Sequence, residues 1–231
     1  MCIRDSSWVD PGSNLEDVLP VGLVLPPTDL IRQAAEAFYF CSGKLFHVFD
    51  RNWAELNFKN VFRSELGRDA RRVALCEVCC VAAVGALYME EQTSIEDTLY
   101  QIARALLDDV VLNSPLRAAK CCILLGMFNI MNKGTVALSY IETGICLSRR
   151  FWVHTTQRLM DLNHEDWLDG KRTWRTLLFL GGYVVCAKLE SPPLTFSCSW
   201  ISATLDYVTS NAWWPSDLSV CIPLVKAKGL D

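Results

Sequence analysis

The sequence predicts an all-α protein: a bundle of about seven or eight antiparallel helices with an irregular N-terminal arm and a C-terminal tail. Apolar residues recur at helical spacing over most of residues 28–189, and capping residues or short turns separate the periodic segments. Long runs of alternating apolar and polar residues, which are typical of strands, are absent. With 51% apolar and 21% charged residues, the 231-residue chain has core material for one globular domain.

Three segments are expected along the chain. Residues 1–27 contain four prolines and two glycines without a sustained period, which is typical of an irregular arm or linker. Residues 28–192 form the helical domain. Residues 193–231 combine tryptophans with many serines and threonines and receive no assigned element, so this tail is expected to be truncated or non-native. Residues 1–6 resemble translated sequencing-adapter DNA, which indicates that the true beginning of the chain is missing.

The first three helices are predicted between residues 29 and 89. Residues 29–41 place apolar side chains on one face, and Thr28 is available as an N-cap after a double proline. Asp50 is expected to cap a second helix that ends near Gly67. Residues 69–89 begin with charged residues and then become apolar on every side, which predicts a buried central helix.

Two further helices follow, and their capping residues set their bounds. Ser94, with Asp97 three residues later, is a variant capping box for an amphipathic fourth helix. Ser114 and Pro115 end that helix and begin the next, because serine caps and proline is tolerated at the first helical position. The fifth helix, residues 116–131, is mostly apolar and is expected to be the second buried helix.

The last two helices are predicted over residues 135–150 and 165–189. Residues 132–134 form a turn so short that the sixth helix must run antiparallel to the fifth. Gly181 and Gly182 lie in the middle of the seventh helix, where each glycine costs about 1 kcal/mol relative to alanine. Such a pair marks a kink, a close helix contact or a helix break.

Eleven cysteines lie mostly in apolar surroundings, without sequons or a secretory leader, which indicates reduced thiols in a reducing compartment. Cys76 and Cys79, with Cys80 beside them, have the spacing of a zinc or redox pair. A second pair at a suitable distance is absent, so we predict that these cysteines pack in the core and that the chain has no metal site.

Several function classes are disfavoured by the sequence. A net charge of −4 without a stripe of Lys and Arg argues against direct DNA binding by this chain. The longest apolar runs are shorter than the roughly 18 residues of a membrane span, so no membrane association is expected. Nucleophile-elbow, dinucleotide-binding and phosphate-loop motifs are absent, which predicts that the chain is not an enzyme.

A series of degenerate motifs nevertheless occurs in a familiar order. They are residues 34–40, 75–88, 114–126 and 137–145, followed by His154 and residues 171–174. Over about residues 28–192 this series resembles the fungal-specific transcription factor domain, the middle homology region of fungal two-zinc, six-cysteine cluster regulators. The closely spaced, Lys/Arg-rich cysteines of the zinc cluster itself are not found in the chain.

The resemblance implies a fragment of a nuclear transcription factor: the regulatory domain, which acts on genes transcribed by RNA polymerase II. Sequence-specific DNA binding and zinc are then expected only in the missing N-terminal cluster, with no cofactor in this chain. Its partners would be a small-molecule effector or a transcriptional co-regulator. We take Lys171, Arg172 and Trp174 as candidates for an effector or partner crevice. The alternative is that they are ordinary core and surface residues.

Two other functions stay open at this point. The first is a helical protein-interaction scaffold with no role in transcription. The second is an all-α enzyme with a dispersed active site, which no motif supports. A six-cysteine cluster encoded in frame upstream of Trp8 would favour the transcription factor over the scaffold.

Overall fold

The computed structural model describes residue 15 and residues 17–44, 46–63, 65–89, 95–132, 136–156 and 164–188. The chain divides into two compact units, residues 1–189 and 190–231, and all described residues belong to the first. The described residues form seven α-helices and no strand, which confirms the all-α prediction. The helices are α1 (Thr28–Phe40), α2 (Arg51–Val61), α3 (Arg68–Ala86), α4 (Ile95–Asn113), α5 (Pro115–Met131), α6 (Ala137–Thr156) and α7 (His164–Lys188), with a short 3₁₀ helix η1 (Ser42–Lys44) after α1.

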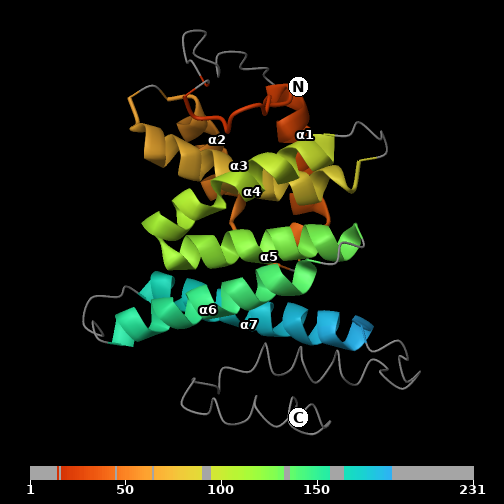
Figure 1. Cartoon of the computed structure of the whole chain (residues 1–231), viewed down its shortest axis with the longest axis vertical. Helices are drawn as coiled ribbons and strands as arrows, with labels where there is room; N and C mark the ends of the chain where they lie inside the picture. The colour runs from red at the N-terminus through yellow and green to blue at the C-terminus, as the bar shows by residue number, and fades with distance from the viewer. Residues whose placement is uncertain are drawn as a thin grey trace, which may run out of the picture. The chain divides into compact units, whose positions relative to one another are not determined.

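Helices α3 and α5 lie at the centre of the first unit. Figure 1 shows α5 between α3 and α4 on one side and α6 and α7 on the other, and it packs against all four. Helices α1 and α2 cover α3. Because α3 and α5 have neighbours on several sides, every residue of α3 from Val73 to Ala86 is buried, as are most residues of α5. Both helices predicted to be buried are therefore the central ones.

The predicted caps differ in outcome. The Asp50 carboxylate accepts hydrogen bonds from the backbone N–H groups of Asn52 and Trp53 at 2.7 and 3.2 Å, which confirms that cap. The Ser114 hydroxyl oxygen accepts one from the Arg117 N–H at 3.4 Å, with Pro115 at the first helical position, also as predicted.

The predicted Thr28 cap is wrong. Thr28 is itself the first residue of α1, and the N-cap position belongs to Pro27, which makes no side-chain capping bond. The Pro27 carbonyl accepts the N–H groups of Leu30 and Ile31, so the helix starts one residue earlier than predicted. Proline's fixed φ suits this entry into a helix, and it makes a hydroxyl cap unnecessary.

Other boundaries shift by a few residues. Helix α3 ends at Ala86 rather than at residue 89, and α6 continues to Thr156 rather than ending at residue 150. Helix α7 is continuous through Gly181 and Gly182, so no helix break occurs there. Ser94, residues 133–135 and the tail from residue 193 lie outside the described residues.

Small residues allow close helix contacts at two places. At Gly144 of α6, an added Cβ atom would lie 2.6 Å from Leu177 Cδ2 and 3.1 Å from Cys122 Cβ. At Gly85 of α3, an added Cβ would lie 1.8 Å from the Ala34 carbonyl oxygen, so the backbones of α1 and α3 touch. At Gly85 glycine is required because a side chain would overlap the backbone of α1, whereas at Gly144 the Leu177 side chain would have to shift.

Residues 17–27 of the N-terminal segment contain no helix, and Asp17 and Val18 at their start contact α3. Val18 is fully buried, and its carbonyl accepts a hydrogen bond from Arg72 at 3.1 Å, while Arg68 donates to the Asp17 carbonyl at 2.7 Å. Among the described helices, none combines the length and the apolar character that crossing a bilayer requires.

Candidate functional site

A crevice of about 250 Å³ opens between α1, α2 and α3, and we call it the α1–α2–α3 crevice. Its apolar side is formed largely by buried residues of α3 and α2, whereas its charged residues are exposed except for the half-buried Lys59. The lining residues are Arg32, Ala35, Glu36 and Tyr39 of α1, Arg51, Ala54, Glu55, Phe58 and Lys59 of α2, and Val78 and Val81 of α3.

The crevice exists because small side chains line it where large ones would fill it. Ala35 and Ala54 contribute only methyl groups from α1 and α2. Gly85 fixes α1 directly against the α3 backbone, while α2 is held on α3 by separate contacts. Val78 and Val81 of α3, which are nearly fully buried, form the bottom of the crevice between the two covering helices.

Ion pairs and an aromatic contact organise the charged residues of the crevice. Arg51 contacts Glu36 and lies 3.8 Å from Glu55, and its hydrogen bond to Glu36 is the main cause that raises the pKa of Arg51. The Arg32 guanidinium lies 5.5 Å from the Phe58 ring centroid. The lining thus presents guanidinium groups beside an apolar surface, the combination that binds a carboxylate attached to an apolar body.

Tyr39 adds a polar group with a fixed orientation. Its hydroxyl donates a hydrogen bond to the Asp50 carbonyl at 3.2 Å, across the connection between α1 and α2. Burial raises the pKa of Tyr39 above its usual value, so the phenol stays neutral at physiological pH. Its ring lies edge-on to Phe38, with centroids 5.2 Å apart, which locks the side chain at the edge of the crevice.

Outside the crevice lining, a buried carboxylate joins α2, α3 and α5. Glu77 of α3 is fully buried and accepts a hydrogen bond from Asn57 Nδ2 at 3.0 Å and from the Arg117 guanidinium. Burial raises the pKa of Glu77 to about 8, and Arg117 opposes that rise. Arg117 also lies 5.5 Å from the Trp53 ring centroid, so one cation ties α5 to both α3 and α2.

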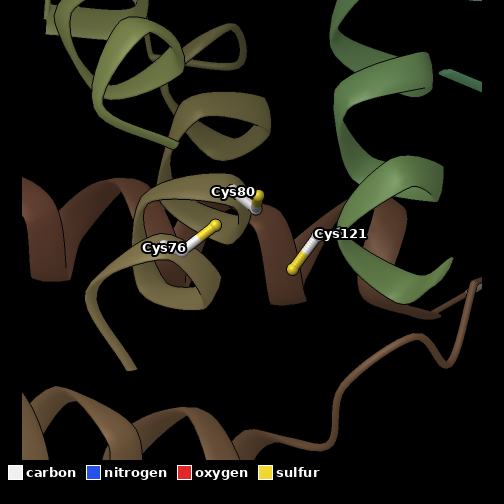
Figure 2. Close-up of side chains that lie close together, drawn as sticks. All are labelled: Cys76, Cys80 and Cys121. Carbon is white, nitrogen blue, oxygen red and sulfur yellow. The ribbon is translucent and has the colours of Figure 1, made fainter. Parts of the chain in front are cut away.

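Three cysteine thiols meet between the two central helices. Figure 2 shows Cys76 and Cys80 on successive turns of α3 and Cys121 on the facing α5. Their sulfur atoms all lie within 4.8 Å of one another, and none of the three residues is more than 1% exposed. Hydrogen bonds from Cys121 and Cys80 lower the pKa of Cys76 to about 7. The partner of Cys76 along α3 is thus Cys80, four residues on, and Cys79 lies outside this cluster.

The three residues predicted for an effector crevice lie on α7 and do not line the α1–α2–α3 crevice. Trp174 is only 8% exposed, and the Arg149 guanidinium of α6 lies 5.9 Å from its ring centroid. Lys171 Nζ lies 4.9 Å from the Trp167 ring centroid, and Arg172 is exposed. Trp174 therefore faces the α6–α7 contact, while Arg172 faces solvent.

Sequence reasoning missed the crevice, the buried carboxylate and the third thiol. Glu77 was detectable as the one acid within the apolar part of α3, and Phe58 as an aromatic residue in a polar helix. The i, i+4 spacing of Cys76 and Cys80 already places their thiols on one helix face. None of these three signals predicts which other helix supplies the remaining residues.

Comparison with known proteins gives no match: neither a family model, nor a curated protein, nor a solved structure matches this chain. The expected kinship with fungal transcription factor domains stays a prediction.

Proposed function

We propose that the helical domain is the regulatory part of a fungal zinc-cluster transcription factor and that its α1–α2–α3 crevice binds a small effector. The observation that carries effector binding is the crevice itself, an apolar surface with arginines around it. The ordered motif series and the all-α architecture support the regulatory assignment. DNA recognition and zinc then belong to a segment outside this chain, and the protein works in the nucleus.

The lining indicates what kind of effector fits. A volume of about 250 Å³ is slightly below the roughly 300–1,000 Å³ typical of drug-sized sites, so the ligand is small. Ala54, Phe58, Val78 and Val81 offer an apolar surface for an aromatic or branched aliphatic body. Arg51 is engaged by both acidic residues of the lining, whereas Arg32 lies 3.9 Å from the exposed Asp29, a weak contact, so Arg32 is the cation that favours an anionic group on the ligand. A small aromatic carboxylate combines these features.

Lys171, Arg172 and Trp174 have a different role in this proposal. Trp174 supports the packing of α7 against α6, while Lys171 is half-buried and Arg172 is exposed on α7. Effector contact is assigned instead to α1, α2 and α3.

The second candidate function is a protein-interaction scaffold with no role in transcription. Exposed apolar side chains favour it, notably Phe40, which is 73% exposed, and Leu112, which is 86% exposed. They lie on different helices, α1 and α4, and isolated exposed apolar residues are normal on protein surfaces. The scaffold therefore ranks below the regulatory domain.

Two variants of α1 test effector binding, with naphthalene-2-carboxylate as the probe. Ala35→Leu adds bulk inside the crevice, whereas Gln33→Leu adds the same apolar side chain at an exposed position outside the crevice lining. At about 0.4 kcal/mol per non-hydrogen atom, the probe should bind the unmodified chain with a Kd on the order of 0.1 mM. We expect Ala35→Leu to abolish binding and Gln33→Leu to leave it unchanged. Equal binding by both variants would contradict the site.

The transcription assignment has a separate test that does not depend on the crevice. Genomic and transcript sequence in frame upstream of Trp8 should encode six cysteines in a basic segment. A start codon without such a cluster would instead favour the scaffold.

A further inference from the structure

The thiol cluster offers three ligands of one chemical kind. Cys76 and Cys80 are four residues apart on α3 and therefore share a helix face, and Cys121 meets them from α5 (Figure 2). No other His, Cys, Asp or Glu side chain in the part of the chain that the structure describes joins this group. The donor set is thus three sulfurs, which soft ions prefer over hard ones.

The spacing of the sulfurs fits coordination of a single ion. Bonds of about 2.3 Å to one centre hold three sulfurs roughly 3.4 to 4 Å apart, and the shorter separation belongs to the pyramidal geometry of a trivalent metalloid. The three sulfurs already lie within 4.8 Å of one another, so binding needs shifts of roughly an ångström or less, which side-chain rotation supplies. Cys79 and Cys122, on the same two helices, are equally buried but do not join the group.

Charge decides which soft ion suits the cluster. All three sulfurs are buried, and the two charged residues next to them in sequence have partners of their own: Glu77 pairs with Arg117, and Lys120 pairs with Asp169. A complex that carries net charge would be costly at such a place. Three thiolates around a monovalent copper ion carry two negative charges, and around zinc one, whereas around a trivalent ion they carry none. Zinc also prefers a fourth ligand.

We propose that Cys76, Cys80 and Cys121 form a binding site for one trivalent thiophilic metalloid ion, with arsenic(III) as the representative. Arsenous acid, As(OH)₃, would exchange its three As–O bonds for three As–S bonds. Each thiol proton leaves with a hydroxide as water, so three waters are released and no electron is transferred. The product is uncharged and links α3 to α5 covalently, which would stabilise the centre of the domain.

The buried position predicts slow binding. The sulfurs are reached only when α3 and α5 separate locally, so uptake follows local opening rather than diffusion to an open pocket. Single exposed thiols such as Cys146 do not supply three ligands, so they compete weakly for arsenic(III). This makes arsenite a more selective probe of the cluster than a thiol-alkylating reagent.

The test is arsenite binding to the full reduced chain, read by native mass spectrometry. One arsenic should bind per chain and raise the urea midpoint of unfolding. Cys121→Ala should weaken binding at least tenfold, while Cys122→Ala, a neighbouring and equally buried change on α5, should not. The pair Cys80→Ala and Cys79→Ala repeats the comparison on α3. Absence of binding, or equal loss in both members of a pair, would overturn the proposal.

A second measurement uses the unmodified chain and so does not depend on how the variants fold. Bound arsenite should protect Cys76, Cys80 and Cys121 from alkylation during slow opening, as read by peptide mass spectrometry, and leave Cys79 and Cys122 reactive. Protection of all five, or of none, would refute the three-sulfur site. Stoichiometric zinc or copper(I) on the same three thiols, without arsenic, would also refute the preference for a trivalent ion.

Discussion

Replacing Gly85 by alanine should force α1 away from α3 and destabilise the domain by about 2 kcal/mol. The added Cβ would lie 1.8 Å from the Ala34 carbonyl oxygen, 2.7 Å from the Ala34 carbonyl carbon and 2.9 Å from the Phe38 nitrogen. All three are backbone atoms of α1, so no side-chain rotation relieves the overlap. Overpacking costs about 1–3 kcal/mol, and contact with rigid backbone favours the upper end. Up to about 1 kcal/mol of helix propensity, gained with alanine, offsets part of that cost.

Urea unfolding followed by circular dichroism measures this loss. With a slope of about 2 kcal/mol per molar urea, the midpoint should fall by about 1 M. Gly181→Ala is the control, since its Cβ would lie 3.5 Å from Ile141 Cγ2, an ordinary contact. That variant should be as stable as the unmodified chain or up to about 1 kcal/mol more stable. A Gly85→Ala variant with an unchanged midpoint, or equal losses in both, would refute the packing of α1 on α3.

Two further predictions concern α2, the helix that walls one side of the crevice. Asp50→Ala removes the cap bonds to the Asn52 and Trp53 N–H groups and should lower the free energy of unfolding by about 1 kcal/mol. Asp50→Asn should recover most of that loss, and equal losses for both variants would show that the cap does not matter. Asn57→Ala leaves the buried Glu77 carboxylate with one donor fewer and should cost about 2 kcal/mol in urea unfolding, whereas Asn52→Ala at an exposed position should change stability by less than about 0.5 kcal/mol.

Local features of the sequence predicted the helices well because their determinants lie within a few residues. Asp50 and Ser114 act on N–H groups two or three positions away, so their capping roles follow from sequence alone. The N-cap predicted at Thr28 was wrong because the prolines before it let the helix begin one residue earlier. The apolar character of α3 and α5 correctly indicated the two central helices.

The candidate sites depend on which helices pack together, and the sequence pattern does not specify that packing. Cys76 and Cys80 share a face by spacing, but only the packing of α5 on α3 adds Cys121. The crevice likewise requires three helices and two small residues, Ala35 and Ala54, that are unremarkable in sequence. Helical geometry alone places Arg172 and Trp174, two residues apart, on nearly opposite faces of α7.

The most direct test of the effector crevice is methyl-detected nuclear magnetic resonance of the unmodified chain titrated with naphthalene-2-carboxylate. The largest shifts are expected at the methyl groups of Ala35, Ala54, Val78 and Val81, which line the crevice. The uncharged carboxamide should cause weaker shifts because it lacks the group that pairs with arginine. Shifts centred on other methyl groups, such as those of Leu177 between α6 and α7, or no shifts at all, would contradict the effector crevice.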